Sequence, residues 1–284
     1  MTASKKKPIL YKYFALTFII SWSLWSPFYF SQEISEFWVL PGAWGPTIAA
    51  LILTYLNRGK AGIAELLRKL LKWKASFKYY IFSIFGVLLI GIITVLIHKT
   101  TGGEFPDSKI VLEGMGLSEG QIGLAIMLSP IFFLINTLLG GPIAEELGWR
   151  GYAQEMMQRK FTPNISGLLI GFLWSIWHLP LIVFLPKAVG HMPVLAYIPL
   201  MTAMGVIFSW LYNRTKGSVL FAILLHGGMN FTHGFLGSNA LSDSNFLMIQ
   251  VTLIVVVAIL LSQWNKTKFS SGQKKTITGS IAEI

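Results

Sequence analysis

The chain contains about eight successive stretches of roughly 20 predominantly apolar residues, the length that a helix needs to cross a bilayer core. Only 12% of its 284 residues are charged, whereas a soluble domain carries about 25%. So many long apolar runs exceed what a water-soluble core could bury. We therefore predict an all-α, polytopic membrane helix bundle. The expected spans cover residues 11–31, 37–56, 77–98, 121–141, 164–185, 192–212, 218–236 and 245–264.

The loops between these spans differ sharply in charge. If the N-terminus lies in the cytoplasm, 20 of the 23 Lys and Arg residues fall on the cytoplasmic side. This asymmetry follows the positive-inside rule and predicts that both termini are cytoplasmic. The net charge of +11 is thus explained by membrane topology, and no nucleic-acid partner is expected. Residues 1–264 should form one transmembrane domain, followed by a polar, basic, disordered cytoplasmic tail over 265–284.

Two segments of the sequence indicate structural rather than catalytic roles. Residues 60–74 place leucines and Ile63 at helical spacing opposite basic side chains, which predicts an amphipathic helix in the cytoplasmic interface. Such a helix either binds anionic lipid or only connects two spans, and we favour the connector. In the fifth span, Gly167 and Gly171 form a small-residue pattern that is typical of close helix packing.

Ionisable residues inside or beside a span are functional candidates, because burying a charge in the bilayer costs about 2.5–3.5 kcal/mol. Glu145, Glu146 and Arg150 directly follow the fourth apolar stretch. Glu146 and Arg150 are four residues apart, so they share a helix face and can form an ion pair. Glu145 is turned by about 100° from Glu146 and remains available for another role.

Two further spans each contain a histidine. His178 lies in the fifth span, and His226 lies in the seventh with Asn230 four residues later on the same helix face. His233 continues this stripe; it could join the site or reach the outer water layer, and we favour the second. A lone histidine in a span more often packs and forms a hydrogen bond than catalyses a reaction. Glu, His and Asn from three spans, however, are together the groups that a hydrolytic site needs.

The three segments resemble the three motifs of the CPBP membrane proteases, which include the type II CAAX prenyl endopeptidases and the bacteriocin-processing Abi proteins. The first motif is Glu-Glu, three residues and Arg; the second is an aromatic residue, usually Phe, four residues before His; the third is His, three residues and Asn. The matching residues are Glu145, Glu146 and Arg150, then Trp174 and His178, then His226 and Asn230. The motifs together occupy residues 145–230.

The resemblance implies an intramembrane endopeptidase in which Glu145, with His178, activates water for attack on the scissile carbonyl. His226 and Asn230 would donate hydrogen bonds to the oxyanion, and Arg150 would hold Glu146 and its helix in place. The cavity would open to the cytoplasm, so cleavage is expected near the cytoplasmic side of the membrane.

The sequence leaves the role of a metal ion open. Two His and a Glu are the ligands of some catalytic zinc sites, but the HExxH spacing is absent. A metal-free glutamate mechanism fits the same residues, so Zn²⁺ is an alternative rather than a requirement. The chain has no cysteine, which excludes disulfides, thiolate metal ligands and a cysteine nucleophile.

Two other classes of protein stay open. A proton-coupled transporter should carry polar groups in both halves of the chain, whereas here they cluster within residues 145–230. A non-catalytic bacteriocin-immunity or scaffold protein could retain the motifs. The expected partners are the lipid bilayer and a peptide or membrane-protein substrate, and the composition favours a multi-pass protein of a bacterial cell membrane. The sequence carries no signal for the oligomeric state.

Overall fold

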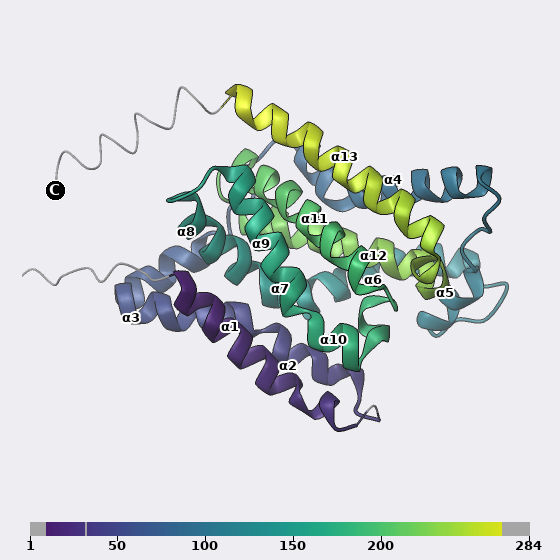
Figure 1. Ribbon diagram of the computed structural model, residues 1–284, viewed down its shortest axis with the longest axis horizontal. Helices are drawn as coiled ribbons and strands as arrows, with labels where there is room; N and C mark the ends of the chain where they lie inside the picture. Colours follow the sequence, from purple (N-terminus) through teal and green to yellow (C-terminus); the bar gives the residue numbers. More distant parts are fainter. Residues whose placement is uncertain (1–9, 32, 269–284) are drawn as a thin grey trace, which may run out of the picture.

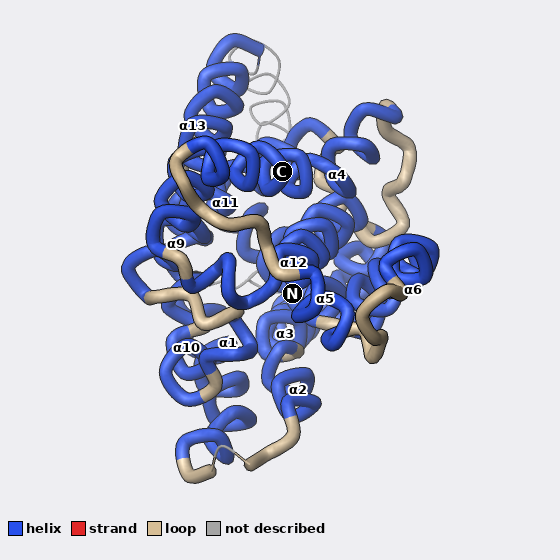
Figure 2. Tube along the Cα trace, turned by 90° about the vertical axis from the view of Figure 1, so that its right-hand side faces the viewer, coloured by secondary structure: helices blue, strands red, loops and turns tan. Residues whose placement is uncertain are grey.

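The computed structural model describes residues 10–31 and 33–268, and all regular secondary structure in that part of the chain is helical (Figures 1 and 2). The all-α fold class is therefore confirmed. Most of the predicted tail lies outside the described residues, and its first four residues, 265–268, continue the last helix. In chain order the elements are α1 (Leu10–Trp25), η1 (Ser26–Tyr29), η2 (Glu36–Trp38), α2 (Val39–Ala43), α3 (Gly45–Arg68), α4 (Phe77–Thr100), α5 (Ser108–Gly114), α6 (Ile122–Leu139), α7 (Gly141–Glu146), η3 (Leu147–Gln154), α8 (Glu155–Gln158), α9 (Pro163–Trp177), α10 (Leu179–Phe184), η4 (Pro186–Val189), α11 (Val194–Arg214), α12 (Val219–Ser242) and α13 (Ser244–Lys268).

Seven helical segments of the described chain are long and apolar enough to cross a membrane. They correspond to seven of the predicted spans, which makes the protein a multi-pass membrane protein. The remaining predicted span, 11–31, is the 16-residue helix α1 continued by the short 3₁₀ turn η1. The seven segments are Glu36–Arg68, Phe77–Thr100, Ile122–Gln158, Pro163–Phe184, Pro186–Arg214, Val219–Leu236 and Ser244–Trp264.

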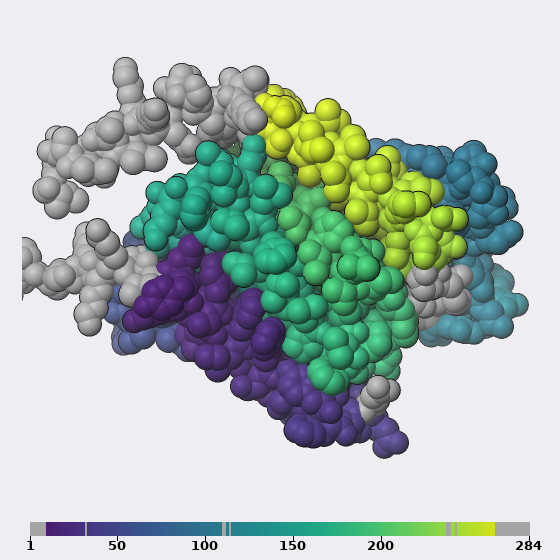
Figure 3. Space-filling view, viewed as in Figure 1, coloured from purple at the N-terminus to yellow at the C-terminus, as the bar shows by residue number. Residues whose placement is uncertain are grey.

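Helices α9 and α11 pack closely at the centre of the bundle. A Cβ atom added at Gly167 would lie 2.8 Å from the carbonyl oxygen of Gly205, and one added at Gly171 would lie 2.5 Å from that of Met201. Only residues without a side chain allow two backbones to approach so closely. The predicted helix contact at Gly167 and Gly171 is therefore confirmed. Helix α13 packs outside α11 and α4 at the surface of the molecule (Figure 3). It leaves apolar side chains such as Leu260 exposed, as expected for a surface facing lipid.

Contacts between distant loops define two ends of the bundle. At one end, Lys69 pairs with Glu155, and the ammonium group of Lys72 lies 3.1 Å from the carbonyl oxygen of Lys216. We call this the basic end; it holds α8 and the end of α3, on the left in Figure 1. At the opposite end, which we call the acidic end, Lys187 pairs with Glu36 at 2.7 Å.

The fourth span is broken rather than continuous. Helix α6 ends at Gly140, where a side chain would collide with the carbonyl oxygen of Asn136 at 2.4 Å. The chain then restarts as α7 with Pro142 in its first turn, a position that needs no backbone N–H. It continues through the π-helical segment η3, of which all eight residues are buried. The break separates a lipid-exposed half of the span from a buried half, which carries the Glu-Glu-Arg motif.

The segment predicted as an interfacial helix packs against this buried half. Gly59 has φ +60°, which bends the end of α3 away from the span. Leu66 and Lys69 are buried, and the Lys69 ammonium group contacts both the Gly151 carbonyl oxygen and Glu155. The segment therefore connects two spans, as favoured from the sequence, and also covers η3 at the basic end.

Candidate active site

Glu145 lies on α7 near the centre of the bundle and is only 4% exposed. The indole Nε1 of Trp174, on α9, donates a hydrogen bond of 2.8 Å to Glu145 Oε2. This contact holds one carboxylate oxygen in a fixed position. Phenylalanine, the usual residue at this position of the resembled motif, could not form it, because it has no hydrogen-bond donor. The role of Trp174 was not predicted from the sequence.

Glu146 is fully buried and has two partners. Arg150 Nη1 lies 3.3 Å from Glu146 Oε2, which confirms the predicted ion pair. Nδ1 of His226, on α12, lies 2.9 Å from Glu146 Oε1, a contact that the sequence did not predict. The Arg150 guanidinium carbon also lies 4.0 Å from the centre of the Phe208 ring and 4.7 Å from that of Trp174. Glu146 therefore links the first and third motifs directly.

The hydrogen bonds of the two histidines fix how their rings face the site. His178 follows the last residue of α9, and its Nδ1 lies 2.9 Å from the carbonyl oxygen of Trp174. A carbonyl only accepts, so Nδ1 carries the hydrogen and Nε2 of the neutral ring carries a lone pair. The Glu146 carboxylate likewise accepts from Nδ1 of His226. Within the described residues, neither Nε2 atom forms a hydrogen bond, so both remain available to a ligand.

A cavity of about 710 Å³ joins these groups. The four predicted catalytic residues, Glu145, His178, His226 and Asn230, all line it. Glu146 and Arg150, predicted as orienting residues, lie behind its wall. Sequence spacing thus separated the glutamate that faces the cavity from the glutamate that is held by an ion pair.

Two further residues of the cavity wall were not predicted. Tyr197, on α11, packs edge-on against His178 with 5.5 Å between the ring centres. His233, which was expected to face the outer water layer, also lines the cavity, and within the described residues its buried Nε2 has no hydrogen-bond partner. Its position agrees with the seven-residue spacing from His226, which places both residues on the same face of α12.

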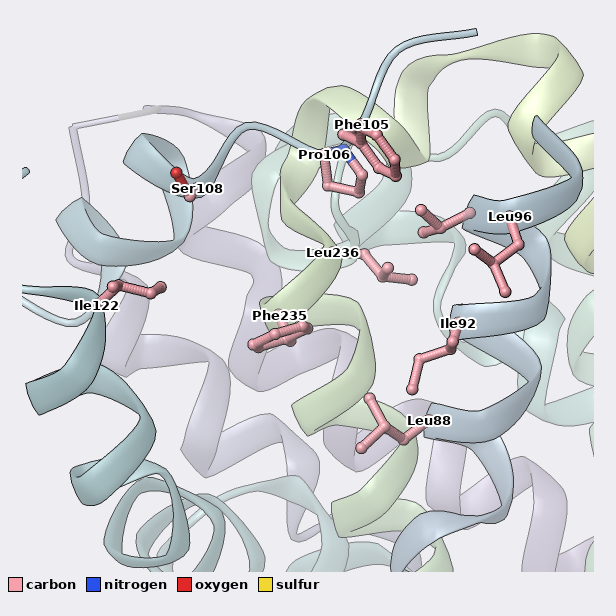
Figure 4. A pocket seen from close by; sticks show the side chains of 10 residues that line it. Leu88, Ile92, Leu96, Phe105, Pro106, Ser108, Ile122, Phe235 and Leu236 are labelled. Carbon is pink, nitrogen blue, oxygen red and sulfur yellow. The ribbon is translucent and has the colours of Figure 1, made fainter. Parts of the chain in front are cut away.

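The cavity extends toward the acidic end of the bundle. Its wall includes Glu36, Lys187 and Leu241, and the Glu36 and Lys187 side chains are about half exposed. A second hollow, of about 240 Å³, lies between α4, α6 and α12 and is lined almost entirely by apolar side chains (Figure 4). The described residues that line this hollow bring no set of polar groups together, so the larger cavity is the candidate active site.

Glu145, His178 and His226 are residue types that can bind a metal ion. Among the described residues, no three His, Asp or Glu side chains converge closely enough to hold a metal ion. The Nδ1 contact of His226 with a carboxylate is common behind metal-bound histidines, but it equally orients a histidine that binds water. The described residues therefore do not form a ready metal site.

The fold and the cavity define an integral membrane protein with glutamate, histidine and asparagine side chains gathered inside its helix bundle. Residues 127–232, which include all three motifs, match a family model described as "Type II CAAX prenyl endopeptidase Rce1-like". The chain is 25% identical over 263 residues to the CAAX prenyl protease 2 of Methanococcus maripaludis, an alignment that covers 88% of this chain and 92% of that protein. Both matches make the chain similar to the CAAX-protease-like (CPBP) membrane proteins.

A second relative has a different name. The chain is 25% identical over 179 residues to the Lysostaphin resistance protein A of Staphylococcus haemolyticus. This alignment covers 62% of the chain and 45% of that protein. The relatives of this chain therefore include one named for an enzymatic activity and one named for a resistance phenotype.

Proposed function

We propose that this protein is an intramembrane endopeptidase that hydrolyses a peptide bond with water activated by Glu145. One observation carries the proposal: Glu145, His178, His226 and Asn230, from three different spans, line a single cavity. The two matches support a protease, because the family model is described as a CAAX prenyl endopeptidase and one relative is named CAAX prenyl protease 2.

The proposed reaction begins with water bound between Glu145 and His178. Glu145 accepts a proton from this water as its oxygen attacks the scissile carbonyl carbon. The Trp174 indole holds Oε2 and so fixes the direction in which the carboxylate faces. The proton then passes to the leaving amine nitrogen as the C–N bond breaks, and His178 Nε2 can carry it there as a lone-pair acceptor.

The tetrahedral intermediate requires hydrogen-bond donors for its oxyanion. The Asn230 amide supplies such a donor in every protonation state. Nε2 of His226 supplies one only when the ring is doubly protonated, because its Nδ1 hydrogen is already bound to Glu146. We therefore assign the permanent donor to Asn230 and a supporting role to His226.

Hydrolysis can be tested with purified, detergent-solubilised protein and a peptide library, read by mass spectrometry. In water enriched in ¹⁸O, each new C-terminal carboxylate should carry one ¹⁸O atom, because the attacking oxygen comes from water. Absence of any cleavage product from protein with a normal melting curve would contradict the proposal. Uptake of a solute driven by a proton gradient, without cleavage, would instead support the transporter.

The match to a lysostaphin resistance protein favours a second candidate, a non-catalytic resistance or immunity protein that retains the motifs. The two candidates differ in what Glu145→Gln does in cells. If the protein is a protease, cells that carry Glu145→Gln should lose the phenotype that the wild-type protein confers. If it is a scaffold, these cells should keep that phenotype when the variant and the wild type are present at equal levels.

A further inference from the structure

We propose that the cavity is entered from the extracytoplasmic side of the membrane, so that the substrate is an extended peptide segment presented at the outer surface. The inference rests on the proposed endopeptidase function, for which it names the substrate class. It replaces the cytoplasmic opening expected from the sequence. Three observations carry it: the charge of the two ends, the residues of the cavity wall and the depth of the reactive groups.

Charge assigns the two ends of the bundle to the two sides of the membrane. Cytoplasmic loops are enriched in Lys and Arg, and extracytoplasmic loops are not. The basic end therefore faces the cytoplasm and the acidic end faces outward. Basic residues at the first end include Arg58, Lys60, Arg68, Lys69, Lys72, Lys74, Lys78, Arg159, Lys160, Arg214 and Lys216. The second end carries Glu33, Glu36, Glu104, Asp107, Glu113, Glu119 and Asp243 against Lys99, Lys109 and Lys187.

The cavity reaches only the acidic end. Its wall includes Glu36, Ala188 and Leu241 from three loops or helix ends at that end. None of the described residues 58–78, 147–164 or 207–222 lines it. Toward the basic end, the buried segment η3 lies beneath Glu145, and the Lys69 ammonium group covers η3 through Gly151 and Glu155. Water and substrate therefore have a path from the outside and a packed barrier toward the cytoplasm.

The reactive groups lie deep within the bundle. Along α12, His226 is about 10 Å from the basic end at Val219 and about 24 Å from the acidic end at Ser242, at 1.5 Å per helical residue. An extended chain advances about 3.3 Å per residue, so roughly seven residues are needed to reach His226 from the outer surface. A folded domain cannot pass down such a cavity. The substrate is therefore a chain end or an unfolded segment next to the membrane.

The natural absence of cysteine allows a direct test, because each introduced cysteine is the only one in the chain. Ala188→Cys places a thiol at the exposed rim of the cavity, and Lys160→Cys places the matched control at the exposed basic end. Intact bacterial cells that express each variant are treated with a membrane-impermeant maleimide. We expect labelling of Ala188→Cys in intact cells and of Lys160→Cys only after permeabilisation. The reverse pattern would overturn the inference.

Membrane vesicles separate this inference from the proposed function. A peptide substrate that cannot cross the membrane should be cleaved by right-side-out vesicles and spared by intact inverted vesicles. Cleavage by inverted vesicles alone would overturn the outward opening while leaving the protease intact. If detergent-solubilised protein cleaves nothing although Ala188→Cys labels from outside, the proposed function fails and the outward-facing cavity stands.

Discussion

Glu146→Ala should lower stability and activity together, because Glu146 holds two buried partners. The substitution leaves the fully buried Arg150 guanidinium without its carboxylate and removes the hydrogen-bond acceptor of His226 Nδ1. Breaking a buried ion pair from one side costs about 3–5 kcal/mol. For a chain of this size, that loss corresponds to a fall in Tm on the order of 10 °C. A histidine that loses its orientation can lower the rate on the order of 100-fold.

A double variant separates the two effects. In Glu146→Ala/Arg150→Met, no unpaired charge remains, and the Met side chain can occupy the space beside Trp174 and Phe208. We expect much of the Tm to return while cleavage stays low, because His226 still lacks its acceptor. Melting curves and peptide cleavage are measured on the same detergent preparations. Full recovery of cleavage in the double variant, or a Glu146→Ala protein as stable as the wild type, would refute this reasoning.

Two further substitutions test the packing around the site. Trp174→Phe removes the hydrogen bond to Glu145, which is worth about 1.5–3 kcal/mol for a charged acceptor. We expect kcat to fall roughly 10- to 100-fold with a smaller change in KM, measured by steady-state kinetics of both proteins. Gly171→Ala forces a Cβ atom against the α11 backbone and should cost about 1–3 kcal/mol of stability, measured as a lower Tm. In the control Gly123→Ala, the added Cβ atom meets nothing within 4 Å, so the Tm should be unchanged.

The spans and the reactive residue types could be read from the sequence because the bilayer imposes a fixed length and a high cost on buried charge. The pairing of Glu146 with Arg150 followed from helical periodicity alone. The contact between Glu146 and His226 could not be derived in this way, since it depends on the relative depth of two helices that are 80 residues apart. That depth is set by packing across the bundle, which no local pattern encodes.

The break in the fourth span was also missed, and it changed the reading of the site. The expected span ended at residue 141, whereas the buried chain continues through α7 and η3 to α8. Hydropathy does not distinguish a helix that ends at the water layer from one that turns into the bundle interior. The Glu-Glu-Arg motif was therefore expected directly after the span, whereas it lies in the buried continuation of that span. Toward the basic end, η3 is buried and Lys69 contacts it through the Gly151 carbonyl oxygen.

The most direct test of the account compares peptide cleavage by the wild type, Glu145→Gln and the surface control Glu113→Gln at equal concentrations of folded protein. Gln keeps the size of the side chain but accepts no proton, and loss of a general base costs about 10²–10⁴-fold in rate. The account predicts a loss of this size for Glu145→Gln with an unchanged melting curve, and no loss for the exposed Glu113→Gln. Near-normal cleavage by folded Glu145→Gln would contradict the assignment of Glu145 as the base.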